Sequence, residues 1–133
     1  MNVEIITPIQ LSANYEQSER VGFDIETVGS EVFPQPAILQ FYSKRLEKIS
    51  LVPIFTKEVN LLENKPEMRA LQEILRGVYT VGHWLHSDCP IIYNYFGVMP
   101  KVVGDTFLLS RVMQMKVNAL KDIAAYVWPD RLS

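Results

Sequence analysis

The chain has 133 residues, of which 48% are hydrophobic and 21% charged, and its formal net charge is −2. This composition is ordinary for one soluble globular domain, and no apolar run reaches the roughly 18 residues of a membrane helix. The start MNVEIITPIQ lacks the features of a signal peptide, and the single cysteine, Cys89, excludes an internal disulfide or a cysteine zinc cluster. We therefore expect a cytoplasmic protein that contacts no membrane.

The N-terminal half predicts strands joined by short connections. VEIITPI begins extended, and LSANYEQSER predicts a short helix or a loop. RVGFDIET, AILQFYS and KISLVPI are predicted strands, whereas the glycine and two prolines of VGSEVFPQP predict a turn or loop. The short gaps between the three strands favour an antiparallel meander connected by hairpins.

The C-terminal half alternates helices and strands. After a loop at TKEVNLLE, the helix NKPEMRALQEILRG has capping-box spacing between Asn64 and Glu67, one apolar face, and Gly77 at its end. The strand VYTVGHW leads to a helix in SDCPIIYNYFG, with Ser87 at its cap and Pro90 in its first turn. VMPKVVG is a short strand, followed by the helices DTFLLSRVMQM and NALKDIAAYV. This order predicts an α/β fold whose mixed sheet combines antiparallel hairpins with parallel strands joined by helices.

Two carboxylates lie one residue apart in the apolar segment VGFDIETVG. In a strand, Asp24 and Glu26 project to one face, and Phe23, Ile25 and Thr27 to the other. Two parallel carboxylates repel each other, and a divalent cation such as Mg²⁺ placed between them removes that repulsion. The alternative is that both acids lie on a solvated face of the strand.

Two further aspartates begin predicted helices. Asp88 directly follows a strand, and the ends of strands carry the sites of α/β folds. An aspartate at a helix start also caps the helix or stabilises its dipole. We favour the capping interpretation for Asp105, whereas both interpretations stay open for Asp88.

Five segments, taken in chain order, resemble the DEDD 3′–5′ exonucleases: FDIET, PAILQF, GHWLHSD, GDTFLLSRV and NALKDIA. The most similar branches are the proofreading domain of A-family DNA polymerases and the ribonuclease D group, and the resemblance extends from about residue 3 to residue 127. It implies a ribonuclease H-like fold and hydrolysis of the phosphodiester bond at a 3′ end with two divalent ions, Mg²⁺ or Mn²⁺. By this resemblance Asp24, Glu26 and Asp88 are the catalytic residues and metal ligands, and Thr27 lies where the family contacts the terminal nucleotide.

The second aspartate motif departs from the family at two positions. Trp84 stands where the family commonly has asparagine, and Ser87 where it has an aromatic residue. Trp84 either belongs to the core or stacks on a nucleotide base, an interaction that contributes about 1–3 kcal/mol. His83 and His86 are candidate polar contacts to nucleic acid, or loop histidines without a chemical role.

The family also has a third motif, an aspartate one helical turn after a tyrosine or histidine. Tyr126 and Asp130 have this spacing, but Pro129 lies between them and disfavours a helix there. We therefore expect a single exonuclease-like domain over residues 1–133 that is C-terminally incomplete, ends before the third motif and has little activity alone. A split gene, an expressed fragment and a degenerate member retained for binding all remain open.

The partner that the resemblance implies is the 3′ end of a single strand. DNA is favoured over RNA because SRVMQMKVNALKDIAAYV is similar to the polymerase branch, and a net charge of −2 fits contact with a few nucleotides rather than with a duplex. A DNA polymerase or a complementary exonuclease fragment is a further expected partner, in a bacterial or phage-infected cell or another nucleic-acid compartment. The alternatives are ribonuclease D-like trimming of RNA, a non-catalytic docking module, and self-association through an uncovered apolar surface.

Overall fold

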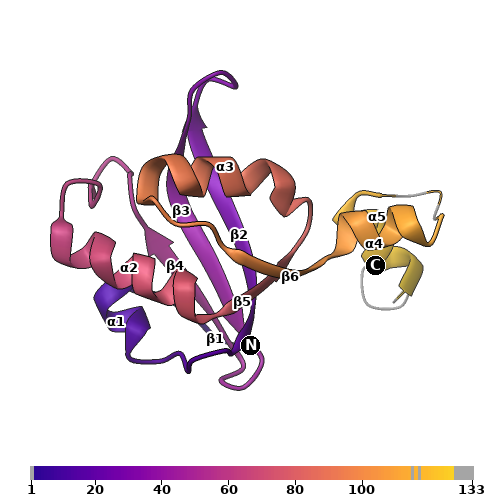
Figure 1. The fold of residues 1–133 in the computed structure, drawn as a ribbon, viewed down its shortest axis with the longest axis horizontal. Helices are drawn as coiled ribbons and strands as arrows, with labels where there is room; N and C mark the ends of the chain where they lie inside the picture. The colour runs from indigo at the N-terminus through magenta and orange to yellow at the C-terminus, as the bar shows by residue number, and fades with distance from the viewer. Residues whose placement is uncertain (1, 115, 117, 128–133) are drawn as a thin grey trace.

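The fold is built around one six-stranded sheet with the strand order β1-β4-β3-β2-β5-β6 (Figure 1). The computed structural model describes residues 2–114, 116 and 118–127. The strands are β1 (Asn2–Ile5), β2 (Arg20–Gly29), β3 (Pro34–Ser43), β4 (Lys48–Pro53), β5 (Tyr79–Gly82) and β6 (Lys101–Asp105). The helices are α1 (Pro8–Ser12), α2 (Lys65–Gly77), α3 (Leu85–Phe96), α4 (Thr106–Val112) and α5 (Leu120–Val127).

The sheet is mixed, as the order of the predicted elements indicated. Strands β2, β3 and β4 form an antiparallel meander, whereas β5 pairs parallel with β2 and β6 pairs parallel with β5. Strand β1 pairs parallel with β4 at the opposite edge. Helices α2 and α3 connect the parallel strands, because such strands need a long crossover connection. The predicted α/β fold is therefore confirmed.

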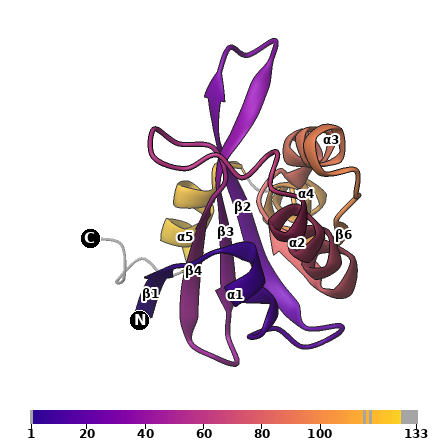
Figure 2. The same cartoon turned by 90° about the vertical axis from the view of Figure 1, so that its left-hand side faces the viewer.

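The two faces of the sheet differ in what covers them. Helices α2 and α3 lie on one side, whereas α5 lies on the other (Figure 2). Alternate residues of β2, β3 and β4 join the helices in one core, and burying each large side chain contributes about 1.5–3 kcal/mol. The core includes Val21, Phe23, Ile25, Leu39, Phe41, Val52, Leu71, Leu75, Leu85, Ile92 and Phe96. The residues of β2 and β3 that alternate with these core residues lie on the opposite face of the sheet.

Helix α2 forms as its sequence predicts. The side chain of Asn64 accepts a hydrogen bond from the backbone N–H of Glu67 at 3.2 Å, which caps the helix start. The Glu67 carboxylate does not complete a capping box but accepts the backbone N–H of Ile9 at 2.9 Å. This contact joins α2 to α1, so a residue predicted to stabilise its own helix instead links two elements.

Helix α3 differs from its prediction. It begins at Leu85 with Trp84 as the N-cap, two residues before Ser87, and Pro90 lies inside the helix rather than in its first turn. The cause is a cap from another strand, because the Asp105 carboxylate accepts the backbone N–H groups of Trp84 and Leu85 at 2.8 and 2.7 Å. A local reading of the sequence has no access to this contact.

The predicted loop VGSEVFPQP is mostly strand. β2 continues to Gly29 and β3 begins at Pro34, so only residues 30–33 connect them. Helix α4 is shorter than predicted, since it ends at Val112. The Tyr126–Asp130 spacing cannot be compared, because the side chain of Tyr126 and residues 128–133 lie outside the described residues. None of the described helices is both long and apolar enough to span a bilayer.

Candidate active site

Asp24 and Glu26 occupy alternate positions of β2, and both side chains are exposed. Phe23 and Ile25 flank Asp24 and are only 5% and 7% exposed, so the predicted alternation of faces is confirmed up to Glu26. A register shift against β3 follows directly, between Glu26 and Thr27, and Thr27 is exposed as well. Thr27 begins the exposed end of the hairpin, so its predicted place on the face of Phe23 and Ile25 stays a prediction.

The two acids lie on a part of β2 that has a partner strand on one side only. Strand β5 pairs with β2 as far as Gly22↔Val81, whereas β3 pairs with it beyond Glu26. The chain leaving β5 turns at Gly82, where an added Cβ would lie 2.7 Å from the carbonyl oxygen of Phe23. Glycine is required here because a side chain would push the end of β5 away from β2. The turn leads straight into α3, next to the acids.

Asp88 lies in the first turn of α3 and is partly buried. The pKa of its carboxyl is raised to about 6, chiefly by burial and next by the negative charge of Asp24. Asp105 and Glu26 add smaller effects in the same direction, whereas a hydrogen bond with Ser87 lowers the pKa. The three acids that the resemblance singles out therefore lie within electrostatic range of one another, and none of them forms an ion pair with another described residue.

These carboxylates do not form a closed metal cage. Within the described part of the chain, no three His, Cys, Asp or Glu side chains converge closely enough to hold an ion. The donor set nevertheless suits a hard divalent cation, since it offers carboxylate oxygens alone and excess negative charge. A bound cation would relieve the same repulsion that raises the pKa of Asp88. The residues present therefore fit a divalent ion.

Asp105 has a structural role, as its predicted N-cap position indicated. Besides the start of α3, its carboxylate accepts the backbone N–H groups of Phe107 and Leu108 in α4, at 2.9 and 3.3 Å. Burial opposes ionisation, but these four hydrogen bonds outweigh it, so the pKa of Asp105 is lowered. One carboxylate thus fixes the starts of two helices.

His83 lies between the acids and α4. Its Nδ1 is 2.9 Å from the hydroxyl oxygen of Thr106, and that hydroxyl donates to the carbonyl of Gly82 at 3.3 Å. Nδ1 donates to this hydroxyl or accepts from it, according to the tautomer of the imidazole. The tautomer with its proton on Nδ1 would leave Nε2 as an acceptor.

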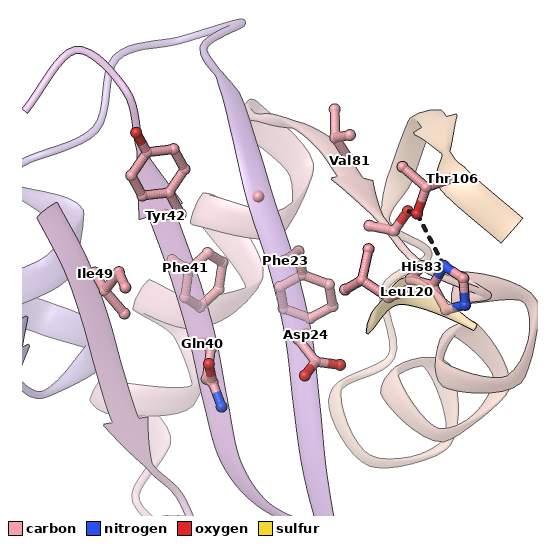
Figure 3. Close-up of a pocket in the computed structure, with 12 residues that line it drawn as sticks. Phe23, Asp24, Gln40, Phe41, Tyr42, Ile49, Val81, His83, Thr106 and Leu120 are labelled. Atoms are coloured by element: carbon pink, nitrogen blue, oxygen red, sulfur yellow. Dashed lines mark hydrogen bonds between the residues drawn. The ribbon is translucent and has the colours of Figure 1, made fainter. Parts of the chain in front are cut away.

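A groove of about 470 Å³ lies beside Asp24 on the face of the sheet opposite α2 and α3. Its lining includes Asp24, Gln40 and Tyr42 from the strands, His83 from the turn, and Leu120 from the start of α5 (Figure 3). The groove therefore brings together two residues that the sequence nominated, Asp24 and His83. It also adds two that the sequence did not, Gln40 and Tyr42, whose place follows only from strand register.

Trp84 is 37% exposed, so it is not a buried core residue. Its ring packs on Phe107 at 4.2 Å between centroids and on His86 at 5.4 Å. His83 makes an edge contact with Phe107 at 5.6 Å. Sequence reasoning missed Phe107, because its only local signal is its position in the α4 segment.

The strand order, the mixed strand directions and the placement of the helices define a ribonuclease H-like α/β fold. No protein-family model matches the sequence, and no curated protein does. Solved structures of nucleases do match the fold.

Brucella melitensis NrnC with bound Mg²⁺ matches with a TM-score of 0.70 and 18% identity, over 100% of this chain and 65% of that protein. Escherichia coli RNase D, an exoribonuclease involved in structured RNA processing, matches with a TM-score of 0.71 and 17% identity, over 100% of this chain and 35% of that protein. Trypanosoma brucei RNase D in complex with RNA U12 matches with a TM-score of 0.74 and 13% identity, over 95% of this chain and 46% of that protein. The chain thus spans between 35% and 65% of the length of these proteins, and at such identities the likeness establishes the fold.

Proposed function

We propose that the chain is the catalytic module of a 3′–5′ exonuclease, which removes nucleoside monophosphates from the 3′ end of single-stranded nucleic acid. The observation that carries the proposal is that Asp24 and Glu26 lie within electrostatic range of Asp88 on a ribonuclease H-like sheet, where burial and their negative charge raise the pKa of Asp88. Uncompensated carboxylates at the ends of strands are typical of functional sites.

In this proposal the three carboxylates hold two divalent ions, Mg²⁺ or Mn²⁺. When bound, the ions supply the positive charge that activates water and stabilises the leaving 3′ oxygen. Asp24 and Glu26 face the substrate from β2, and Asp88 approaches from α3. Thr27, His83 and Trp84 contact the terminal nucleotides, with Nε2 of His83 as a hydrogen-bond acceptor.

RNA is the better supported substrate. NrnC has been solved bound to pGG, and the Trypanosoma brucei enzyme with RNA U12. The sequence favoured DNA and a polymerase partner, but none of these structures is of a polymerase. We therefore place trimming of short or single-stranded RNA ahead of DNA proofreading.

The family resemblance calls for a fourth carboxylate. Among the described residues, Asp105 is the other acid that raises the pKa of Asp88, but its oxygens already accept four backbone N–H groups. We therefore assign the fourth ligand to a segment outside residues 2–127, on the same polypeptide or on a partner.

Calorimetric titration with Mn²⁺ tests the site directly. The purified chain should bind Mn²⁺, and Asp24→Asn and Glu26→Ala should each abolish binding. Glu31→Gln, which removes an exposed acid from the turn between β2 and β3, should leave binding unchanged. Equal binding by all four proteins would contradict the proposal.

A cleavage assay tests the activity and the choice of substrate. RNA and DNA oligonucleotides of the same sequence, labelled at the 5′ end, should shorten one nucleotide at a time, with RNA faster. Asp24→Asn should abolish the ladder. Cleavage in the middle of the strand, or a ladder that survives Asp24→Asn, would overturn the proposal.

A non-catalytic module is the second candidate, and the absence of a complete three-residue metal group among the described residues favours it. Such a module binds a 3′ end without shortening it. Oligonucleotide binding that is unaffected by Mn²⁺ and by Asp24→Asn would support this candidate over the enzyme.

A further inference from the structure

Three aromatic rings lie at the starts of α3 and α4, next to the guanidinium of Arg111 from the last turn of α4. Trp84 packs on Phe107 and His86, and the Arg111 guanidinium lies 5.9 Å from the centre of the Phe107 ring. His86 and Arg111 are exposed, and Trp84 is 37% exposed. We call Trp84, His86, Phe107 and Arg111 the aromatic platform.

The backbone of Trp84 is held in an uncommon conformation. Its φ of 54° and ψ of 45° are left-handed, a region that a bulky side chain rarely adopts. The Asp105 carboxylate holds the residue there by accepting its N–H at 2.8 Å. Asparagine adopts this conformation more readily than a bulky aromatic residue does. Strained residues of this kind cluster at ligand sites.

The platform is joined to the carboxylates. The carbonyl of Trp84 accepts hydrogen bonds from the backbone N–H and from the hydroxyl of Ser87, both at 3.1 Å. The same hydroxyl lies 3.5 Å from the Asp88 carboxylate. Trp84 is the N-cap of α3 and Asp88 lies in the first turn of the same helix, so the two residues are close along the chain. A strand bound at Asp88 therefore passes the platform.

The charge of the platform complements that of a nucleic acid. Asp24, Glu26 and Asp88 repel phosphate unless metal is bound, whereas Arg111 offers a guanidinium beside a π-face. Among the described residues Arg111 forms no ion pair. A ring to stack on and a neighbouring cation are the two elements of single-strand binding without sequence preference.

We infer that the aromatic platform stacks a base close to the 3′ end of a single strand, with Arg111 on the adjoining phosphate. This inference rests on the proposed function, since it names the residues that hold the same substrate. It differs from a purely structural role for Trp84 in the sign of one effect. If the strained tryptophan serves binding, Trp84→Asn stabilises the fold and weakens nucleic-acid binding. If Trp84 serves packing, Trp84→Asn lowers both the stability of the fold and the affinity for nucleic acid.

The test is fluorescence anisotropy with a 5′-labelled single-stranded RNA octamer, in an Asp24→Asn background that prevents cleavage. Trp84→Asn should weaken binding by about 5- to 150-fold, and Trp84→Phe by less. Arg111→Gln should weaken binding and reduce the slope of log affinity against log salt by about 0.7. Tyr93→Ala removes another exposed aromatic ring from α3 and should bind as its parent does.

Thermal unfolding of the same proteins completes the test, and Trp84→Asn should melt at the same or a higher temperature than its parent. Unchanged affinity in Trp84→Asn, an equal loss in Tyr93→Ala, a lower melting temperature in Trp84→Asn, or no binding by the parent would each overturn the inference. Its failure is distinguishable from that of the proposed function, which depends on Mn²⁺ binding and cleavage. If a partner protein occupied the platform instead, Trp84→Asn would lose binding to that partner and keep its affinity for RNA.

Discussion

The two faces of the β2–β3 ladder are built from alternate residues of the same strands, yet they have different tasks. On one face Phe23 and Phe41 pack at 5.1 Å between ring centres, and Leu39 is fully buried. On the other face, Asp24 is paired with Gln40 across the ladder. One step along the chain therefore separates a residue that stabilises the fold from one that we propose to be catalytic.

This separation has a physical basis in the coverage of the two faces. Helices cover the first face, so its apolar area is removed from water and stabilises the fold. The groove keeps the second face open to a ligand, and Asp24 lines it. Substitutions on the two faces should therefore separate stability from function.

The largest expected effect on stability comes from the buried face. Leu39→Ala should reduce the free energy of unfolding by about 2–5 kcal/mol, because it leaves a cavity in a sealed core. Its neighbour Gln40→Ala should change that free energy by no more than about 0.5 kcal/mol. Urea denaturation of both variants measures the difference, and similar losses would break the comparison of the two faces.

The next largest loss of stability is expected at Asp105, whose carboxylate caps both α3 and α4. Asp105→Ala removes the acceptor of four backbone N–H groups at two helix starts, and each lost cap costs about 0.5–2 kcal/mol. The free energy of unfolding should therefore fall by about 1–4 kcal/mol, with a smaller loss for Asp105→Asn. Wild-type stability in Asp105→Ala would show that solvent replaces the carboxylate.

Asp88 should make stability depend on pH. Its pKa is about 6 in the folded chain and near the ordinary 3.8 in the unfolded chain, so the folded chain holds the proton more tightly. Stability contributed by the protonated carboxyl is present below the lower pKa and is lost as the pH rises through 6. In EDTA, the wild type should lose stability relative to Asp88→Asn over this window, and equal pH profiles would contradict the assignment.

The smallest expected effect on stability belongs to Asp24. Because its side chain is exposed, Asp24→Asn should change the free energy of unfolding by no more than about 0.5 kcal/mol. Mn²⁺ should stabilise the wild type against heat and should not stabilise the variant. A variant that is strongly destabilised would show that Asp24 belongs to the structural face.

Much of this fold follows from local sequence patterns. Alternation in VGFDIETVG is enough to place Asp24 and Glu26 together, and the spacing of Asn64 and Glu67 is enough to start α2. These sequence signals predict the structure correctly because each depends on residues within one turn or one strand. The order of the elements then suffices to predict a mixed sheet.

What the sequence did not reveal depends on contacts between distant residues. The start of α3 is set by Asp105, which lies 20 positions after Leu85. The conformation of Trp84 and its packing on Phe107 arise from the same contact. The length of the β2–β3 hairpin was missed because glycine and proline favour turns locally, whereas pairing across the ladder extends the strands.

The bulge after Glu26 makes the far end of this hairpin a separate module for engineering. Glu26 pairs with Ile38 and Thr27 with Pro36, and the skipped residue, Ala37, accepts the N–H groups of Ile54 and Phe55 at 2.8 and 3.1 Å. That anchor holds the register of the acids independently of the tip. A dye or an immobilisation tag inserted after Ser30 would therefore report on the protein, or tether it to a surface, without turning Asp24 away from the groove.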